Sequence, residues 1–298
     1  MIKNIFFVFF LLSVTFSRSQ DLDSLLNSQL DGETDYTVAT FKATRIISCH
    51  SIERMQKGDL DFRIAHRFGA VNTGAHEFFG LDQSNNQLGL EYGFFDWLMA
   101  GVGRATYQKT YNGFFKISFL RQCKGQKNIP VSVSFFSGLY INSLKWQESD
   151  RVNYFSSRLS YVHQLLIARK FSPSFSAQLT PSLCHRNFTG NSEIPNDFFA
   201  LGIGVRYKLT VRTSVNVEYF YIPDAPLAAF ETYCPLSVGF DIETGGHVFQ
   251  IQLTNSMNVT ENTFLGETTG QWKNGDLHLG FNITRVFTIG GNKNKKQE

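Results

Sequence analysis

The stretch that most constrains the fold is GFDIETGGHVFQIQL, residues 239–253. Two glycines, Gly245 and Gly246, suit the two positions of a hairpin turn that need positive φ. With this turn Thr244 faces His247, and every pair further out follows. The pairing sorts the side chains into two faces, and a slip of one residue would mix them. The apolar face holds Val238, Phe240, Ile242, Phe249, Ile251 and Leu253, and the other holds Ser237, Gly239, Asp241, Glu243, Val248, Gln250, Gln252 and Thr254.

The segment 199–221 alternates in the same way. A three-residue loop at 209–211 pairs Lys208 with Arg212 and places Arg206 opposite Ser214. One face is then an apolar band about nine residues long, close to what a tilted transmembrane strand needs. A soluble sandwich would cover that band with a second sheet. A barrel in lipid turns it outward and flanks it with aromatic residues, as found here, so we predict a transmembrane barrel.

The amino end predicts export. Residues 1–19 combine one cation, Lys3, an apolar run at 5–14 and small residues at Ser17 and Ser19, which is the pattern of a secretory signal peptide. The apolar run is shorter than the roughly 20 residues of a transmembrane helix. No later run approaches that length, and the mean hydropathy is -0.16. Barrel strands hide their lipid face in every second residue, so such an average fits a barrel.

Strands are predicted at 59–68, 87–93, 98–109, 113–122, 130–142, 155–169, 174–186, 198–208, 212–222, 235–243, 247–256 and 276–287. The connections alternate between short and long over most of the chain, like the periplasmic turns and outer loops of transmembrane barrels. The expected fold is all-β, an antiparallel transmembrane β-barrel of about 12 strands, with 14 as the alternative.

The strand-like segment 38–52 is the source of that alternative. It is either a further element folded inside or beneath the barrel, or one strand of an additional pair. We therefore divide the chain into the signal peptide at 1–19, a periplasmic N-terminal arm at 20–37, the β-barrel at 38–288 and a polar C-terminal tail at 289–298.

The weakest part of this scheme is the hairpin around Asn112-Gly113. Asn-Gly is a strong turn signal. A turn there places Arg104 and Arg121 in phase with Phe119, on a face that should meet lipid. A bulge in one strand would restore the phase.

Five runs resemble a family of uncharacterised outer-membrane-type β-barrel proteins of Gram-negative bacteria, which is catalogued as a domain of unknown function. They are GDLDFRIAHRFG (58–69), LGLEYGFFDWLMAGVGR (88–104), QLLIARKFS (164–172), GFDIETGGHVFQIQLTNS (239–256) and GDLHLGFNITRVFT (275–288). The resemblance covers nearly the whole mature chain. It implies an exported barrel in the outer membrane and supplies no catalytic or ligand residues.

Charged residues on the polar phase of the strands are the candidate site. In a lumen they would either pair across the barrel and rigidify it or select a polar solute, as rings of charge do in pores. For the two acids nearest the Gly-Gly turn, Arg206 or Lys208 are the expected counter-ions. His247 falls on the opposite face from Glu243, so it completes no triad with the acids. The lumen-lining candidates are Arg63, Arg67, Glu91, Arg206, Glu218, Asp241 and Glu243.

Other functional classes receive little support from the sequence. The net charge is +3, and the basic cluster at 293–296 is confined to the tail, so nucleic acid is not an expected partner. The histidines show no paired metal-ligand spacing, and we predict neither a metal nor a cofactor. One or two disulfides are compatible with export, among Cys49, Cys123, Cys184 and Cys234.

Three functions remain in order of preference. The first is a channel or binding barrel for small polar solutes, embedded in outer-membrane lipid. The second is a structural or partner-docking barrel without transport, whose protein partner the sequence does not identify. The third is a barrel-embedded lipid-modifying enzyme, which the sequence favours least because no G-x-S-x-G motif is present.

Overall fold

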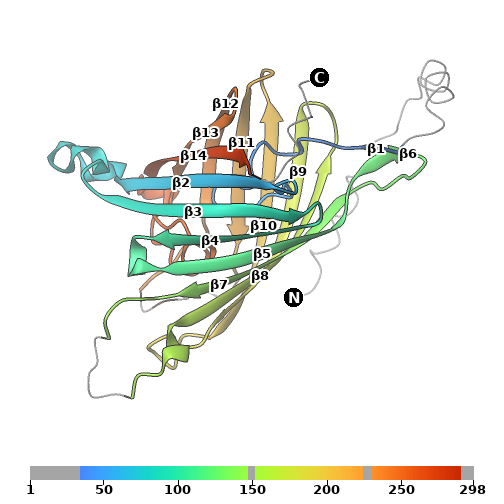
Figure 1. Ribbon diagram of the computed structural model, residues 1–298. Helices are drawn as coiled ribbons and strands as arrows, with labels where there is room; N and C mark the ends of the chain where they lie inside the picture. The colour runs from blue at the N-terminus through green and yellow to red at the C-terminus, as the bar shows by residue number, and fades with distance from the viewer. Residues whose placement is uncertain (1–33, 147–151, 224–227, 229, 290–298) are drawn as a thin grey trace, which may run out of the picture.

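Twelve strands close into one antiparallel barrel in the computed structural model, which describes residues 34–146, 152–223, 228 and 230–289 (Figure 1). The predicted twelve-strand barrel is confirmed, and the alternative of fourteen strands is wrong. The predicted signal peptide, most of the N-terminal arm and nearly all of the C-terminal tail lie outside the described residues. The barrel strands are β2 (Asp59–Ala70), β3 (Ser84–Phe95), β4 (Leu98–Ala105), β5 (Tyr111–Leu120), β7 (Ser132–Ile141), β8 (Leu159–Lys170), β9 (Phe175–Arg186), β10 (Asp197–Lys208), β11 (Thr213–Tyr221), β12 (Leu236–Thr244), β13 (His247–Thr254) and β14 (His278–Thr288).

The two ends of the barrel differ. One end, which we name the turn end, has the connections 96–97, 121–131, 171–174, 209–212 and 245–246. The opposite end, the loop end, has the connections 71–83, 106–110, 142–158, 187–196, 222–235 and 255–277. A small two-stranded sheet of β1 (Thr34–Tyr36) and β6 (Cys123–Gly125) projects from the turn end (Figure 1). Within the described ranges, no helix has the length and apolar character needed to cross a membrane.

The outer surface of the barrel is apolar because alternate side chains point outward. Leu88, Val102, Ile203, Phe240 and Ile251 are all exposed, between 48% and 61%. Aromatic side chains collect toward the turn end, where the rings of Phe95 and Trp97 stack 5.4 Å apart. Such a band with aromatic margins is the surface that a barrel presents to lipid.

The predicted register of the hairpin around Gly245-Gly246 is confirmed over all eight pairs, from Thr244 opposite His247 to Ser237 opposite Thr254. The register predicted for β10 and β11 is wrong by two residues, since Arg206 faces Asn216 and not Ser214. The loop is longer than predicted because Thr210 organises it. Its Oγ1 accepts hydrogen bonds from the amides of Arg212 (3.2 Å) and Thr213 (3.0 Å). A shift of two preserves the faces, so the assignment of inner and outer residues holds.

The turn predicted at Asn112-Gly113 is also wrong. Both residues lie within β5, and the chain reverses earlier, at 106–110, through the short η3 (Tyr107–Lys109). There Gln108 and Lys109 adopt positive φ without being glycine. Asn112 is buried in the lumen, where its Oδ1 accepts a hydrogen bond from Gln87 (3.0 Å). The phase along β5 is reset by a register shift between Ser118 and Leu120.

Two segments fill the barrel. We name residues 38–58 the plug and residues 255–277 the cap. The plug follows β1 and lies inside the wall, with residues 40–52 almost entirely buried. The predicted segment 38–52 is therefore an inner element and not a wall strand. The cap connects β13 to β14 and folds into the loop end, carrying the short helix α2 (Glu261–Gly266) with five of its six residues buried.

The filled lumen has an apolar side and a charged side. The apolar side is a cluster that joins Phe41, Ile46 and Ile47 of the plug and Phe264 of the cap to inward-facing wall residues, among them Phe114, Phe136, Phe198 and Phe220. At Gly204 the wall comes so close to the plug that a Cβ atom would collide with Ile46. All four cysteines are free thiols, so the disulfides considered from the sequence are not formed.

Candidate functional site

The seven predicted lumen residues all lie on the inner phase of their strands. Arg63 and Arg67 come from β2, Glu91 from β3, Arg206 from β10, Glu218 from β11, and Asp241 and Glu243 from β12. Six of them are buried, and Glu243 lies at the turn end with 39% of its side chain exposed. The structure places most of them against the plug, which the sequence did not indicate. That they act on a solute stays a prediction.

Glu91 is the acceptor of a buried charged cluster on β2 and β3. Arg45 of the plug places Nη1 3.0 Å from Glu91 Oε1, and Thr44 Oγ1 donates to Glu91 Oε2 at 2.7 Å. The Nε of Arg63 lies 3.8 Å from the same carboxylate, and its Nη2 donates to Gln87 Oε1 (2.8 Å). A buried carboxylate needs such partners because desolvation of an unpaired charge is costly. Arg45 was missed because the segment around it has the pattern of a strand.

Glu218 binds the main chain of the plug directly. Its Oε2 accepts hydrogen bonds from the amides of Ile47 (3.1 Å), Ser48 (3.2 Å) and Cys49 (3.0 Å). Three successive N–H groups around one carboxylate oxygen form the kind of concave anion site known from backbone nests. Glu218 is therefore an anchor for the turn of the plug, which answers why a wall strand carries an acid at this position.

Other wall side chains hold the plug by its carbonyl groups. Asn282 Nδ2 donates to Ile47 O (2.8 Å), and Gln250 Nε2 donates to Ile46 O (2.9 Å). Gln178 Nε2 donates to His50 O (2.8 Å). Lys116 Nζ donates to Ser51 O (2.9 Å), as well as to the carbonyl of Glu53. These bonds come from five different strands when Glu218 is counted, so the wall grips the plug from several sides.

Arg206, one of the expected counter-ions of the two acids on β12, lies near Asp241 but reaches it through Ser214 and not by a direct ion pair. Glu243 pairs with Lys42 of the plug. Asp241 is satisfied by hydrogen bonds from Gln250 Nε2 (2.9 Å) and Ser214 Oγ (3.4 Å). Arg206 donates to Ser214 Oγ (3.1 Å) and reaches the plug at the carbonyl of Ala39 (3.3 Å). The sequence could not show Lys42 as a partner because it lies about 200 residues away along the chain, in a segment with no predicted place.

The plug meets the cap at Glu261. Its Oε2 accepts a hydrogen bond from the hydroxyl of Tyr140 on β7 (2.7 Å), and its Oε1 lies 3.6 Å from Arg45 Nε. The same oxygen lies 3.5 Å from His50 Nε2. Arg45 thus stands between Glu91 of the wall and Glu261 of the cap. The inner closure of the barrel depends on these mutually neutralising charges.

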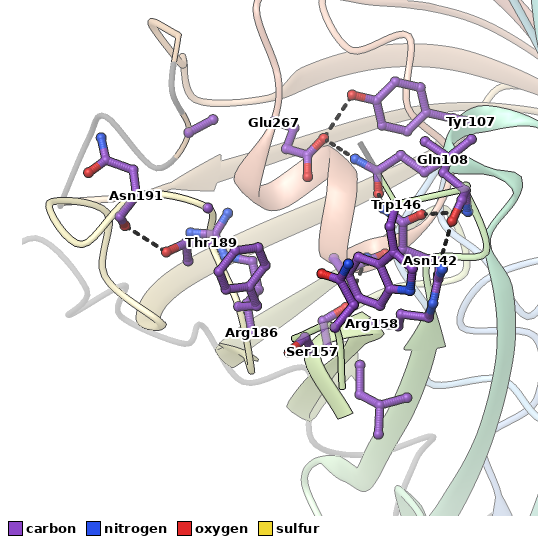
Figure 2. A pocket seen from close by; sticks show the side chains of 18 of the residues that line it. Tyr107, Gln108, Asn142, Trp146, Ser157, Arg158, Arg186, Thr189, Asn191 and Glu267 are labelled. Atoms are coloured by element: carbon purple, nitrogen blue, oxygen red, sulfur yellow. Dashed lines mark hydrogen bonds between the residues drawn. The ribbon is translucent and has the colours of Figure 1, made fainter. Parts of the chain in front are cut away.

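An open pocket of about 600 Å³ lies at the loop end, above the cap. Its wall is formed by residues 142–146, 153–158 and 188–191 and by η3, and its floor includes Asn262 and Glu267 of the cap. In Figure 2 the carboxylate of Glu267 receives hydrogen bonds from Tyr107 (2.8 Å) and Gln108 (3.0 Å). Burial raises the pKa of Glu267 above its usual range. This pocket could not be predicted from the sequence, because its residues come from segments far apart in the chain.

Polar side chains and aromatic rings alternate around the pocket. Arg158 Nη1 donates to the carbonyl groups of Asn142 (2.7 Å) and Leu144 (2.5 Å), and its guanidinium lies 4.0 Å from the ring of Trp146 (Figure 2). Across the pocket Thr189 Oγ1 donates to Asn191 O (2.8 Å). Across the described part of the chain, no three His, Cys, Asp or Glu side chains gather as metal ligands would.

An antiparallel barrel with an apolar outer band and a polar, filled interior belongs to the class of membrane-bound β-barrels. The chain belongs to the family described as membrane bound beta barrel domain (DUF5777), whose model matches residues 41–287. Among curated proteins, none matches the sequence.

Solved structures with similar folds include a porin and two outer-membrane proteins. The NanC porin matches with a TM-score of 0.50 and 8% identity, covering 77% of this chain and 98% of that one. An outer membrane channel from Pseudomonas putida F1 matches with a TM-score of 0.49 and 13% identity, covering 79% and 98%. Outer membrane phospholipase A from Escherichia coli, as an active site mutant, matches with a TM-score of 0.43 and 11% identity, covering 80% and 95%. At these identities the likeness to the NanC porin shows a shared fold alone, and the two weaker matches carry no argument.

Proposed function

We propose that the protein is an outer-membrane β-barrel of a Gram-negative bacterium that binds a small polar solute at its loop end and admits it through a gated lumen. In this proposal residues 1–19 are a cleaved signal peptide, residues 20–37 are a periplasmic arm, and residues 289–298 form a polar periplasmic tail. The loop end faces outward and the turn end faces the periplasm, as is general for such barrels.

One observation carries the proposal: the floor of the pocket and the inner closure belong to the same segment. Glu267 lines the pocket, and Glu261, six residues earlier in the cap, contacts Tyr140 and Arg45 inside the lumen. A solute that contacts Glu267 therefore touches the element that closes the barrel. Binding shifts an equilibrium toward the state that it favours, so a solute that prefers the displaced cap would open the lumen.

The cap has internal bonds that would move with it, and it makes fewer bonds to the barrel strands than the plug does. Asn258 Nδ2 donates to the carbonyl groups of Thr263 (3.4 Å) and Glu267 (3.2 Å), and Thr268 Oγ1 donates to Phe264 O (2.7 Å). These internal bonds can move with the cap, whereas the bonds from Asn85 to Met257 O (3.0 Å), from Tyr140 to Glu261 (2.7 Å) and from Asn262 to Ser160 (3.1 Å) would have to break.

Conductance in planar bilayers tests the proposal. We expect the wild-type protein to conduct rarely, because plug and cap fill the lumen. Glu261→Gln should raise the open fraction, because the amide removes the attraction to Arg45 while keeping an acceptor for Tyr140. The matched control is Glu77→Gln, in the exposed loop between β2 and β3, which should conduct like the wild type.

The filled lumen also favours a second function, a structural or partner-docking barrel without transport. In that case neither Glu261→Gln nor the loss of the anchor in Glu218→Gln would give conductance or swelling of liposomes. The barrel would still fold, and a partner would co-purify with it. If neither variant conducts, the gated-lumen proposal is wrong.

A further inference from the structure

The charges that line the loop-end pocket are mostly positive. Lys145 and Arg158 precede β8 and Arg186 ends β9, whereas Glu267 is the one acid among the lining residues that the structure describes. We infer that this pocket binds a small organic anion, a carboxylate carried on a ring. This deepens the function proposed above for the same site and rests on it only for what happens after binding.

The single carboxylate of the pocket offsets little of this positive charge. Glu267 is engaged by the hydroxyl of Tyr107 (2.8 Å) and the side-chain amide of Gln108 (3.0 Å), so its charge is already compensated by donors. Burial raises the pKa of Glu267, while the hydrogen bonds from Tyr107 and Gln108 and the charge of Arg186 act in the opposite direction. The field in the pocket therefore favours an anion over a neutral molecule or a cation.

The cations are held in place, which matters for recognition. Arg158 is fixed by its bonds to Asn142 O (2.7 Å) and Leu144 O (2.5 Å) and by the ring of Trp146 at 4.0 Å. Arg186 donates Nη2 to Pro195 O (3.2 Å). A guanidinium held in this way loses little further freedom when it binds, and its planar donors match a carboxylate. Figure 2 shows Arg158 and Arg186 among the residues that line the pocket, one just before β8 and the other at the end of β9.

The rest of the pocket suits a ring. Phe188 and Phe230 are among the lining residues and remain 40% and 45% exposed. Asn142, Asn191 and Thr189 supply polar groups around them. A volume of about 600 Å³ is within the range of sites that hold one small ligand. Two kinds of compound share this chemistry, a sugar acid and an aromatic acid.

Calorimetric titration of the refolded full-length barrel in detergent separates the two. Each acid is compared with a neutral twin: glucuronate with glucose, and benzoate with benzyl alcohol. We expect at least one acid to bind about tenfold more tightly than its twin, since each partly exposed ion pair contributes a few-fold and several act together. The pair that shows the preference identifies the ring.

Variants of the exposed lysine make the test specific. Lys145→Glu should abolish the preference for the acid, and Lys145→Gln should weaken it a few-fold. Lys124→Gln, on β6 at the opposite end, is the matched control and should bind like the wild type. Binding of acid and twin with equal affinity, no binding of any of the four compounds at millimolar concentration, or a preference that survives Lys145→Glu combined with Arg158→Gln would overturn the inference.

The two proposals fail separately. Selective binding without conductance would leave the anion pocket standing and remove the gated lumen. Conductance in Glu261→Gln without acid selectivity at the pocket would do the reverse.

Discussion

The plug and the cap both fill the barrel, but the wall makes more hydrogen bonds to the plug than to the cap. Side chains of the wall reach the main chain of the plug: Glu218 binds three of its amides, and Asn282 and Lys116 bind its carbonyl groups. The cap has bonds of its own, such as those that Asn258 donates to Thr263 and Glu267. It makes fewer bonds to the wall, and these involve Asn85, Tyr140 and Ser160.

This difference indicates that the plug is the more firmly held segment and that the cap is the segment more free to move. Displacing the plug would strand several buried polar groups of the wall at once, and each unsatisfied group costs about 1–3 kcal/mol. Displacing the cap breaks fewer bonds between separate elements, because the bonds within it travel with it. We therefore expect the cap to move first and the plug to remain.

The largest effect should come from Glu218. Replacing Glu218 with Gln places an amide group among three N–H donors, which one carbonyl oxygen cannot satisfy as the carboxylate does. We expect a loss of about 3 kcal/mol in the free energy of unfolding, since hydrogen bonds to charged groups contribute about 1.5–3 kcal/mol each. Glu261→Gln should lose about 1 kcal/mol, because the bond from Tyr140 is retained.

Guanidinium unfolding of both refolded variants, followed by tryptophan fluorescence, measures the difference. Equal losses in the two variants would mean that plug and cap are held alike, and the distinction drawn above would be wrong. Glu77→Gln serves again as the control for an exposed acid of the loop end.

A smaller, pH-dependent effect is expected at the joint of the two segments. His50 lies between the rings of Phe114 (4.6 Å) and Phe136 (4.1 Å). Burial, with the charges of Arg45 and Lys116, holds the pKa of His50 well below its usual range. Arg45 Nη1 lies 2.8 Å from Nδ1 of His50. Because arginine can only donate, Nδ1 accepts and the proton of the neutral ring is on Nε2.

The sign follows from proton uptake on unfolding. In the unfolded chain His50 titrates near the usual value of about 6.5, whereas in the folded barrel it stays neutral there. The unfolded state binds more protons below that value, so stability falls as the pH falls, by about 1 kcal/mol near pH 5.5. His50→Asn should remove this part of the slope in thermal unfolding, and His76→Asn, in the exposed η2 (Ala75–Gly80), should not. The same slope in wild type and His50→Asn would contradict the assignment.

The sequence predicted the wall well and the filling poorly, for a physical reason. Alternation and a glycine turn define register locally, so the hairpin of β12 and β13 was predicted in every pair. Between β10 and β11 the turn depends on hydrogen bonds to the Thr210 side chain, which no local sequence pattern indicates. The predicted register therefore differs from the observed one by two residues. At Asn112-Gly113 the pairing of β4 with β5 overrode a strong local turn preference.

The site depends on contacts that no local pattern encodes. Alternation placed the acids of the wall on the inner face, but their partners lie in the plug, where Lys42 and Arg45 occupy a segment with the character of a strand. The pocket is assembled from loops separated by more than one hundred residues, such as those of Asn142 and Glu267. Such long-range pairing is decided by closure of the barrel and not by neighbours in sequence.

The smallest effect is expected at the rim of the turn end, where a partly exposed ion pair joins the plug to the wall. Glu243 pairs with Lys42, and their side chains are 39% and 21% exposed. An ion pair with this access to water contributes less than about 1 kcal/mol. Glu243→Gln and Lys42→Gln should therefore each lower the thermal midpoint slightly, by the same amount, and the double variant should lose no more than either alone. Conductance should stay at the wild-type level, because the plug keeps its central anchor at Glu218. A gain of conductance in Glu243→Gln would show that the plug can be released from the rim, and the plug, not the cap, would then be the gate.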